Sequence, residues 1–190
     1  MENPELFEGD ILTDNSAGES RTVVVSEANL WTDGIVPYAV DPASKINMKL
    51  VREAMSELEN NTCIKFIPRK KEENYIFIYK GKGCHSNVGM KEKRQKISLG
   101  VGCWSKGIIL HELCHVLGFY HEHNRPDRDD YIEIIESNLL PTAKSQFKKY
   151  KPDEVRLLTD YSYDTVMHYG PTTFAKDRKV FTMIPKKEGN

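Results

Sequence analysis

Three histidines and one glutamate within eleven residues constrain this chain more than any other feature of its sequence. Residues 111–121 read HELCHVLGFYH. On a helix, residues i and i+4 lie on one face about one turn apart, so the imidazoles of His111 and His115 can reach one metal ion. Glu112 would lie about 100° further round the helix, beside the ion rather than on it. That position suits a base that acts on a water molecule.

Gly118 predicts where this helix ends and how a third ligand is supplied. Glycine tolerates positive φ and can end a helix with a sharp reversal of the chain. The reversal would bring His121 back to the ion, whereas a continued helix would carry it away. Three protein ligands leave one position open, which is typical of a catalytic zinc site. The alternative is a helix with surface histidines and a buried glutamate, which needs three coincidences at fixed spacing.

A methionine downstream of the helix fits the same pattern. The spacing of residues 111–121 is the metzincin pattern of zinc proteases, which also requires a methionine-containing turn beneath the metal. Met167 lies in the turn-like stretch 162–170. Methionine in a loop usually only fills a packing gap, so Met167 gains meaning from its place after the zinc motif.

Bulk composition excludes several classes of protein. Among 190 residues, 27 Lys and Arg oppose 28 Asp and Glu, which leaves a net charge of -1. This balance argues against a nucleic-acid partner, and no apolar run is long enough to span a membrane. Residues 1–7 lack the basic and apolar regions of a signal peptide. We therefore expect a secreted form to be processed, engineered or incompletely recorded at this end.

Apolar periodicity predicts a sheet-and-helix half followed by an irregular half. Helical spacing over Leu50–Leu58 predicts an amphipathic helix packed on a sheet, and a second helix is centred on Ile108–Leu117. After Gly118 the periodicity weakens, with one helical stretch expected within Tyr131–Tyr150. We expect two lobes with the second helix at their junction. Five short runs are typical of β-strands: Thr22–Val25, Ile35–Val40, Ile64–Ile67, Tyr75–Tyr79 and Lys96–Leu99.

These motifs together resemble the astacin family of metzincins. The resemblance is carried by residues 121–129, which read HEHNRPDRD, and by the turn Met167-His168-Tyr169. It implies an α+β zinc protease domain over residues 22–190. A twisted mixed sheet with helices would form the N-terminal lobe, residues 22–118, and an irregular C-terminal lobe would follow, with the active-site cleft between them. Further matching positions are Trp31, 35–38, 63–66, 83–86 and 107–109.

The resemblance also implies roles for individual side chains. Glu112 would be the general base, and Tyr169 an extra zinc ligand in the resting enzyme. On substrate binding Tyr169 would leave the metal and donate a hydrogen bond to the developing oxyanion. Glu122 would be the buried acid that receives the mature N-terminus, and Cys84 would pair with Cys103.

The first 21 residues resemble the pro-segment of the same family. Phe7-Glu8-Gly9-Asp10 is similar to the segment in which an aspartate takes the place of water on zinc. Asp10 would then be a metal ligand in a latent zymogen, and cleavage after Arg21 would give a mature N-terminus at Thr22. The alternative is an acidic tail without a role.

Several residues depart from the family pattern or stay unassigned. The family has a further C-terminal segment with a cysteine that pairs with Cys63, so we expect this chain to be incomplete at its C-terminus. Cys114 is expected to be a small buried hydrophobic residue. His85, His123 and His168 are assigned to no metal, and we expect His123 to be exposed.

The sequence therefore predicts a secreted zinc-dependent endopeptidase that binds one Zn²⁺ per chain and cleaves internal peptide bonds of proteins. The resemblance implies a preference for acidic residues just after the scissile bond, with Lys176 and Arg178 as partners of that carboxylate. Both could instead be solvated loop charges. Two other functions compete: a non-catalytic secreted binding protein with the same fold, and a metal-dependent hydrolase of non-peptide bonds.

Overall fold

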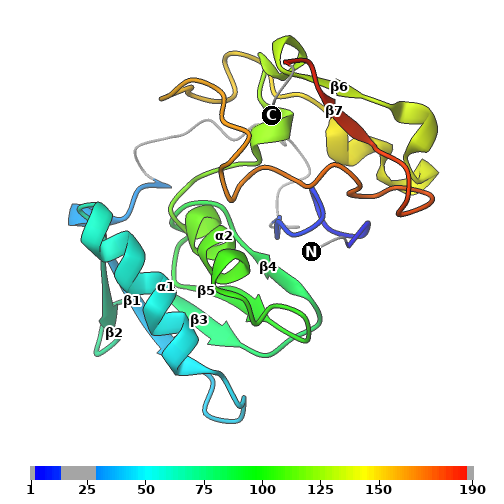
Figure 1. The fold of residues 1–190 in the computed structure, drawn as a ribbon. Coiled ribbons are helices and arrows are strands. Elements are labelled where there is room, and N and C mark those ends of the chain that lie inside the picture. Colours follow the sequence, from blue (N-terminus) through cyan, green and yellow to red (C-terminus); the bar gives the residue numbers. More distant parts are fainter. Residues whose placement is uncertain (1–2, 14–28, 188–190) are drawn as a thin grey trace.

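A five-stranded mixed sheet forms the first lobe (Figure 1). The structure, a computed structural model, describes residues 3–13 and 29–187. The sheet has the order β2-β1-β3-β5-β4; all neighbours are parallel except β4, which runs antiparallel to β5 at one edge. Its strands are β1 (Ile35–Val40), β2 (Lys65–Pro68), β3 (Tyr75–Tyr79), β4 (Cys84–Ser86) and β5 (Arg94–Leu99).

Two helices pack on one face of this sheet. In α1 (Met48–Asn61), Asn47 caps the first turn by accepting a hydrogen bond from the Leu50 amide at 3.3 Å. The residues of α1 that are fully buried recur at helical spacing and pack with α2 (Lys106–Val116) and the inner side of the strands in one core. The members of that core with no more than 1 % exposure include Val36, Val51, Ala54, Met55, Ile76, Ile78, Ile97, Leu99, Ile109, Leu113 and Val116.

The second lobe has its own core and little regular structure. Its only sheet within the described residues is the antiparallel pair β6 (Ile132–Ile134) and β7 (Met183–Pro185). Short 3-10 helices connect the rest: η3 (Glu122–Asn124), η4 (Arg128–Asp130), η5 (Glu136–Asn138) and η6 (Pro141–Phe147). The buried residues of this lobe are Ile132, Leu139, Ala143, Phe147, Tyr161, Tyr169, Phe174 and Met183. No helix in the described part of the chain could cross a membrane.

The predicted α+β architecture is confirmed, with differences in detail. Strands β1 and β3 have the predicted bounds, whereas β2 and β5 are shifted or extended by one or two residues. Strands β4, β6 and β7 were not predicted, because three residues are too short for an alternating pattern. The helical stretch expected within 131–150 consists of 3-10 turns. The predicted strand Thr22–Val25 lies outside the described residues.

The N-terminal segment lies across both lobes. Ile11 forms a parallel bridge with Ser86 of β4, and the Ser86 amide donates to the Asp10 carbonyl at 3.0 Å. On the other lobe, the Gln146 side chain donates to the carbonyls of Pro4 and Leu6, at 3.2 and 3.0 Å. The segment therefore adds a short strand to the free edge of the sheet and ties that edge to η6.

A disulfide fastens the start of β4 to the loop before α2. It joins Cys84 to Cys103, the pairing that the family resemblance implied, and both residues are buried. Cys63 is exposed and Cys114 is partly buried, and neither has a disulfide partner among the described residues. Burial raises the pKa of the Cys114 thiol to about 11, so the group is neutral at physiological pH.

Replacing both Cys84 and Cys103 with serine should lower the free energy of unfolding by about 3 kcal/mol, because the cross-link closes a loop with a sequence separation of 19. Urea denaturation followed by circular dichroism measures the change. Cys63→Ser is the matched control and should leave the midpoint unchanged. Equal stability of the double variant and the wild-type protein would show that the bridge contributes nothing to the fold.

Candidate metal centre

Helix α2 carries two of the three predicted histidine ligands. Ser105 caps its start by accepting a hydrogen bond from the Ile108 amide at 3.3 Å. His111, Glu112 and His115 are all buried, with exposures of no more than 1 %. The two histidine rings lie 4.6 Å apart between their centroids. The helix therefore presents both imidazoles to one point in the interior between the lobes.

A glycine turn brings the third histidine to the same point. Gly118 has φ of 108°, a left-handed conformation that costs glycine little strain. Its amide donates to the His115 carbonyl at 2.8 Å, which satisfies an acceptor at the helix end. The chain then reverses, and the His121 ring lies 4.7 Å from that of His115 and 5.0 Å from that of His111.

Asp10 of the N-terminal segment completes a buried group of four. One ligand atom from each of Asp10, His111, His115 and His121 lies within 4.8 Å of all the others. The carboxylate oxygens of Asp10 lie 3.1, 3.4 and 3.3 Å from the Nε2 atoms of His111, His115 and His121, respectively. Four zinc ligands with bonds of about 2.0–2.1 Å would be separated by roughly 3.4 Å in a tetrahedron. The spacing therefore fits that ion.

The hydrogen bonds of the three rings fix which nitrogen points inward. The Nδ1 of His111 donates to the Val166 carbonyl at 2.6 Å, and that of His115 to the Phe119 carbonyl at 2.8 Å. A carbonyl oxygen can only accept, so each Nδ1 carries the hydrogen and each Nε2 is left with a lone pair. Metal-bound histidines in proteins are usually oriented by such an outer hydrogen bond.

His121 is oriented by a carboxylate rather than a carbonyl. Its Nδ1 donates to Oε2 of Glu8 at 2.7 Å, and the second oxygen of Glu8 accepts from the Tyr150 hydroxyl. Glu8 is 1 % exposed and has φ of 50°, next to Gly9 at 89°. Sequence reasoning gave Glu8 no role. The only sequence signal for Glu8 is its place in the Phe7–Asp10 motif. No sequence signal indicates that Tyr150 belongs to the site.

Several hydrogen-bond acceptors in and beside the group of four have no donor. The Nε2 of His115, Oδ1 of Asp10 and both oxygens of Glu112 are buried and have no hydrogen-bond partner among the described residues. Such atoms destabilise a buried site unless a cation or donor lies between them. The residues present therefore fit a bound metal ion.

Burial and neighbouring charges both shift the pKa values of these residues. Burial alone would raise the pKa of Asp10, but His121, His111 and His115 hold it well below its usual range. Burial lowers the pKa of His115 to about 4. Burial would also lower that of His121, but the Asp10 and Glu8 carboxylates raise it to about 10. Burial and the Asp10 charge raise the pKa of Glu112 well above its ordinary value.

Tyr169 lies beside the group but faces the N-terminal segment. Its hydroxyl donates to the backbone carbonyl of Glu8, and Oδ2 of Asp10 lies 3.2 Å away. The ring is buried, and its centroid lies 4.4 Å from that of the His121 ring.

The turn that precedes Tyr169 forms part of the site, because the Val166 carbonyl accepts the hydrogen bond that orients His111. Met167 is buried, and its carbonyl accepts from the Glu122 amide at 3.0 Å.

Glu122 is held by a local network in this structure. Its Oε1 accepts from Nη1 of Arg125 at 3.0 Å and from the Ser162 amide at 2.9 Å. Arg125 in turn donates to both oxygens of Asp127. The predicted partner of Glu122, Thr22, lies outside the described residues.

The expectation that His123 is exposed is wrong. Its side chain is fully buried, and the ring stacks on Tyr169 with 4.4 Å between centroids and 21° between planes. The 3-10 turn η3 causes this, because it directs the side chain back beneath Tyr169. Burial lowers the pKa of His123 well below its ordinary value.

The other unassigned residues lie apart from the group of four. The Nε2 of His85 contacts the Tyr79 hydroxyl at 3.2 Å, and that of His168 contacts the Tyr161 hydroxyl at 2.6 Å. Lys176 donates to the Ser137 carbonyl at 2.8 Å, and Arg178 is exposed. Neither cation pairs with a carboxylate among the described residues.

Comparisons with known proteins agree with this geometry. The family model of astacin, a family of peptidases, matches residues 23–190. An astacin-like metalloendopeptidase of Gallus gallus is 42 % identical over 192 residues, which cover 97 % of this chain and 46 % of the relative. Zinc metalloproteinase nas-15 of Caenorhabditis elegans is 38 % identical over 209 residues, covering 100 % of this chain and 36 % of the relative. The chain thus spans less than half the length of these two relatives.

A solved structure agrees as well. High choriolytic enzyme 1, a hatching enzyme zinc-protease of Oryzias latipes, superposes with a TM-score of 0.80 at 33 % identity, over 87 % of this chain and 85 % of that one. An overlap of this extent covers residues of both lobes. The chain therefore belongs to the astacin family of peptidases.

Proposed function

We propose that this chain is a zinc-dependent endopeptidase that is made latent by its own first 21 residues. Residues 22–190 would form the catalytic domain, with lobes at 22–118 and 119–190. The observation that carries the proposal is the convergence of three histidine Nε2 atoms on one carboxylate, where the Nε2 of His115 and Oδ1 of Asp10 are buried without a hydrogen-bond partner among the described residues. His111, His115 and His121 would hold the ion in the active enzyme.

Each side chain near the ion has a distinct task in the proposed reaction. Bound zinc supplies Lewis-acid activation of the scissile carbonyl and of a water molecule. Glu112 lies on the same helix and has no competing hydrogen bond, so its carboxylate is free to take the proton of that water and deliver it to the leaving amine. Tyr169 would donate a hydrogen bond from its hydroxyl to the developing oxyanion, which is worth a few kcal/mol in comparable sites.

The N-terminal segment blocks three parts of this machinery at once. The Asp10 carboxylate occupies the open position among the histidines. The Tyr169 hydroxyl is engaged by Glu8 and Asp10. The edge of β4, where an extended peptide could add as a strand, is already paired with residues 10–12 through Ser86. These contacts support a zymogen rather than an inert acidic tail.

An extracellular site of action follows from the same proposal. The buried Cys84–Cys103 bridge is of the kind that persists in oxidising compartments. Substrates would be proteins or peptides, which can lie extended along β4. Glu112 argues against the first competing function, because a binding protein has no use for a buried carboxyl group that lies beside the histidines without a hydrogen-bond partner. The match to the astacin peptidase family argues against the second, a hydrolase of non-peptide bonds.

Two substitutions should separate metal binding from proton transfer. Loss of an outer hydrogen-bond partner typically lowers metal affinity by roughly 10–100-fold. His121→Ala should weaken zinc affinity by more than this, because the two helical histidines alone make an incomplete site. Glu112→Gln keeps the volume and should keep one zinc per chain, but kcat should fall by about 10²–10⁴-fold.

Mass spectrometry of bound metal and turnover of casein by the chain beginning at Thr22 measure the two effects. Glu133→Ala, an exposed residue of the second lobe outside the group of four, is the control and should change neither. Full zinc occupancy of the His121 variant at nanomolar free metal would exclude His121 as a ligand. An unchanged kcat in Glu112→Gln would exclude Glu112 as the base, and wild-type protein inactive on casein would favour a binding protein or another hydrolase.

Latency should depend on Asp10. Asp10→Ala should raise the activity of the uncleaved chain by at least about tenfold, because the carboxylate no longer occupies the position of the attacking water. The chain beginning at Thr22 should be active without any substitution. Glu5→Ala removes an exposed carboxylate from the same segment and should leave the intact chain latent. An intact wild-type chain as active as the trimmed one would refute the zymogen proposal, provided that both are folded by circular dichroism.

Specificity should favour an acidic residue just after the scissile bond. Lys176 and Arg178 are cations of the second lobe without a carboxylate partner in the described residues. Replacing both with alanine should reduce the preference for aspartate over asparagine at that position by about tenfold in kcat/KM, as expected for a close charge pair. Lys179→Ala, one residue further on, is the control. A peptide-library profile without acidic preference would identify both residues as solvated loop charges.

A further inference from the structure

The stretch Lys65–Lys96 concentrates positive charge on a chain that is slightly acidic overall. It holds ten Lys and Arg residues and only three Glu, an excess of seven positive charges. The whole chain has a net charge of -1, so the remainder is acidic. The near-neutral total therefore conceals two regions of opposite charge. The ten cations are Lys65, Arg69, Lys70, Lys71, Lys80, Lys82, Lys91, Lys93, Arg94 and Lys96.

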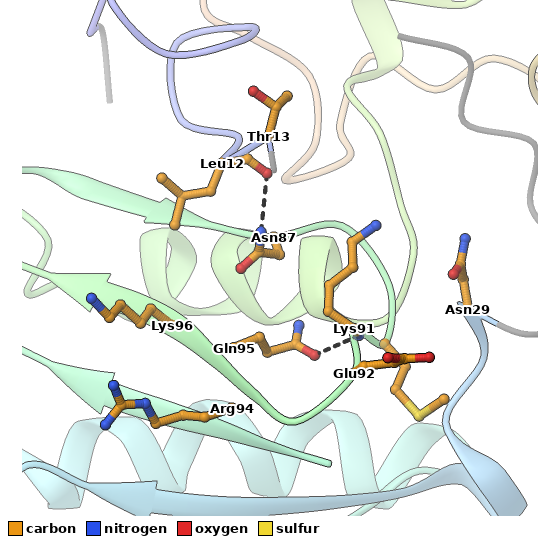
Figure 2. Close-up of a pocket in the computed structure, with 10 residues that line it drawn as sticks. Leu12, Thr13, Asn29, Asn87, Lys91, Glu92, Arg94, Gln95 and Lys96 are labelled. Atoms are coloured by element: carbon orange, nitrogen blue, oxygen red, sulfur yellow. Dashed lines mark hydrogen bonds between the residues drawn. The ribbon is translucent and has the colours of Figure 1, made fainter. Parts of the chain in front are cut away.

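The fold gathers seven of these cations on and around the outer face of the sheet. Strand β3 buries Ile76 and Ile78 toward the helices, so its alternate side chains face the other way. Figure 2 views that outer side: the helices lie behind the strands, and the side chains of Arg94 and Lys96 lie in front. We call this surface the basic face and define it as Arg69, Lys70, Lys71, Lys91, Lys93, Arg94 and Lys96.

Three cation–π contacts align three cations of the basic face along strand β3. Arg69 lies over the Tyr75 ring at 3.9 Å, Arg94 over Phe77 at 5.1 Å and Lys96 over Tyr79 at 5.8 Å, measured to the ring centroids. The three rings are residues i, i+2 and i+4 of one strand, so they repeat about every 6.7 Å along it. The cations are therefore arranged along β3 rather than scattered over a loop.

None of these charges is neutralised within the described part of the chain. No salt bridge of residues 3–13 and 29–187 includes any member of the basic face. The acids nearest in the sequence are Glu72, Glu73 and Glu92, and none of them forms a salt bridge among the described residues. Glu72 accepts hydrogen bonds from the backbone amides of Lys70 and Lys71, at 2.6 and 3.0 Å. The ammonium and guanidinium groups are thus available to an external anion.

A recess of about 600 Å³ opens from the basic face toward the N-terminal segment (Figure 2). Three cations, Lys91, Arg94 and Lys96, and one acid, Glu92, line it on one side, and Leu12 and Thr13 line it on the other. A long anionic chain that lay along the outer face of the sheet could therefore enter this recess. It would not approach the group of four, which lies in the interior.

We propose that the basic face binds a sulfated polysaccharide. Clustered Lys and Arg are the electrostatic footprint of a polyanion site. A single-stranded nucleic acid also needs free aromatic faces for base stacking, and here the cations cover the rings of Tyr75, Phe77 and Tyr79. An anionic membrane is usually bound by cations together with exposed apolar side chains. No large hydrophobic side chain of residues 65–96 is exposed.

Binding of heparin by the full chain tests this proposal. The wild-type protein should be retained on immobilised heparin at about 0.15 M NaCl, the physiological ionic strength. The quadruple variant Lys70→Gln, Lys71→Gln, Arg94→Gln, Lys96→Gln should bind soluble heparin at least about tenfold more weakly. Its dependence of log K on log[NaCl] should be shallower by roughly 3–4, because fewer counterions are released.

A charge-matched control and two rival ligands complete the experiment. The control removes four exposed cations of the second lobe: Lys144→Gln, Lys148→Gln, Lys151→Gln and Arg156→Gln. It should bind heparin like the wild-type protein, and an equal loss in both variants would refute the location. Tighter binding to a single-stranded oligonucleotide or to phosphatidylserine vesicles than to heparin would refute the ligand class, and so would absence of retention. Peptidase activity on a short peptide, measured on the forms of these variants that begin at Thr22, should be the same in all of them, which separates this proposal from the catalytic one.

Discussion

Three buried imidazoles and one carboxylate whose ligand atoms all lie within 4.8 Å of one another can share one site only if a positive charge lies among them. The Nε2 atoms of His111 and His121 are only 3.1 Å apart, and both rings are buried. Much of the surrounding structure serves this constraint. The cap at Ser105 and the turn at Gly118 set the two ends of α2. The outer hydrogen bonds then leave each ring only one nitrogen for the centre.

The three rings donate their outer hydrogen bonds to three different parts of the chain. His111 is oriented by Val166, a residue of the second lobe, and His115 by Phe119, which follows its own helix. His121 is oriented by Glu8, which belongs to the N-terminal segment. The site is therefore assembled across both lobes, and His121 is the histidine whose surroundings would change most if that segment were removed.

The sequence predicted the centre of the site better than its surroundings. The i, i+4 spacing on a helix leaves little freedom, so His111 and His115 could be placed without any knowledge of the fold. Gly118 indicated the turn for a steric reason. Glu8, Tyr150 and the burial of His123 had no comparable signal, because each depends on contacts between segments up to 142 residues apart. The three-residue strands could not be predicted for a related reason. Three residues are too few to show an alternating pattern, and pairing with a distant strand defines them.

The N-terminal segment is covalently attached to the surface that it occupies, so its affinity for that surface never has to be high. Fifteen residues, 14–28, separate its described part from the first lobe. A covalent tether of this length gives an effective concentration on the order of millimolar. A weak ligand at such a concentration still fills its site. Cleavage after Arg21 would release the same peptide into the bulk solution, where dilution alone removes it. Activation would then be irreversible without any change in the contacts themselves.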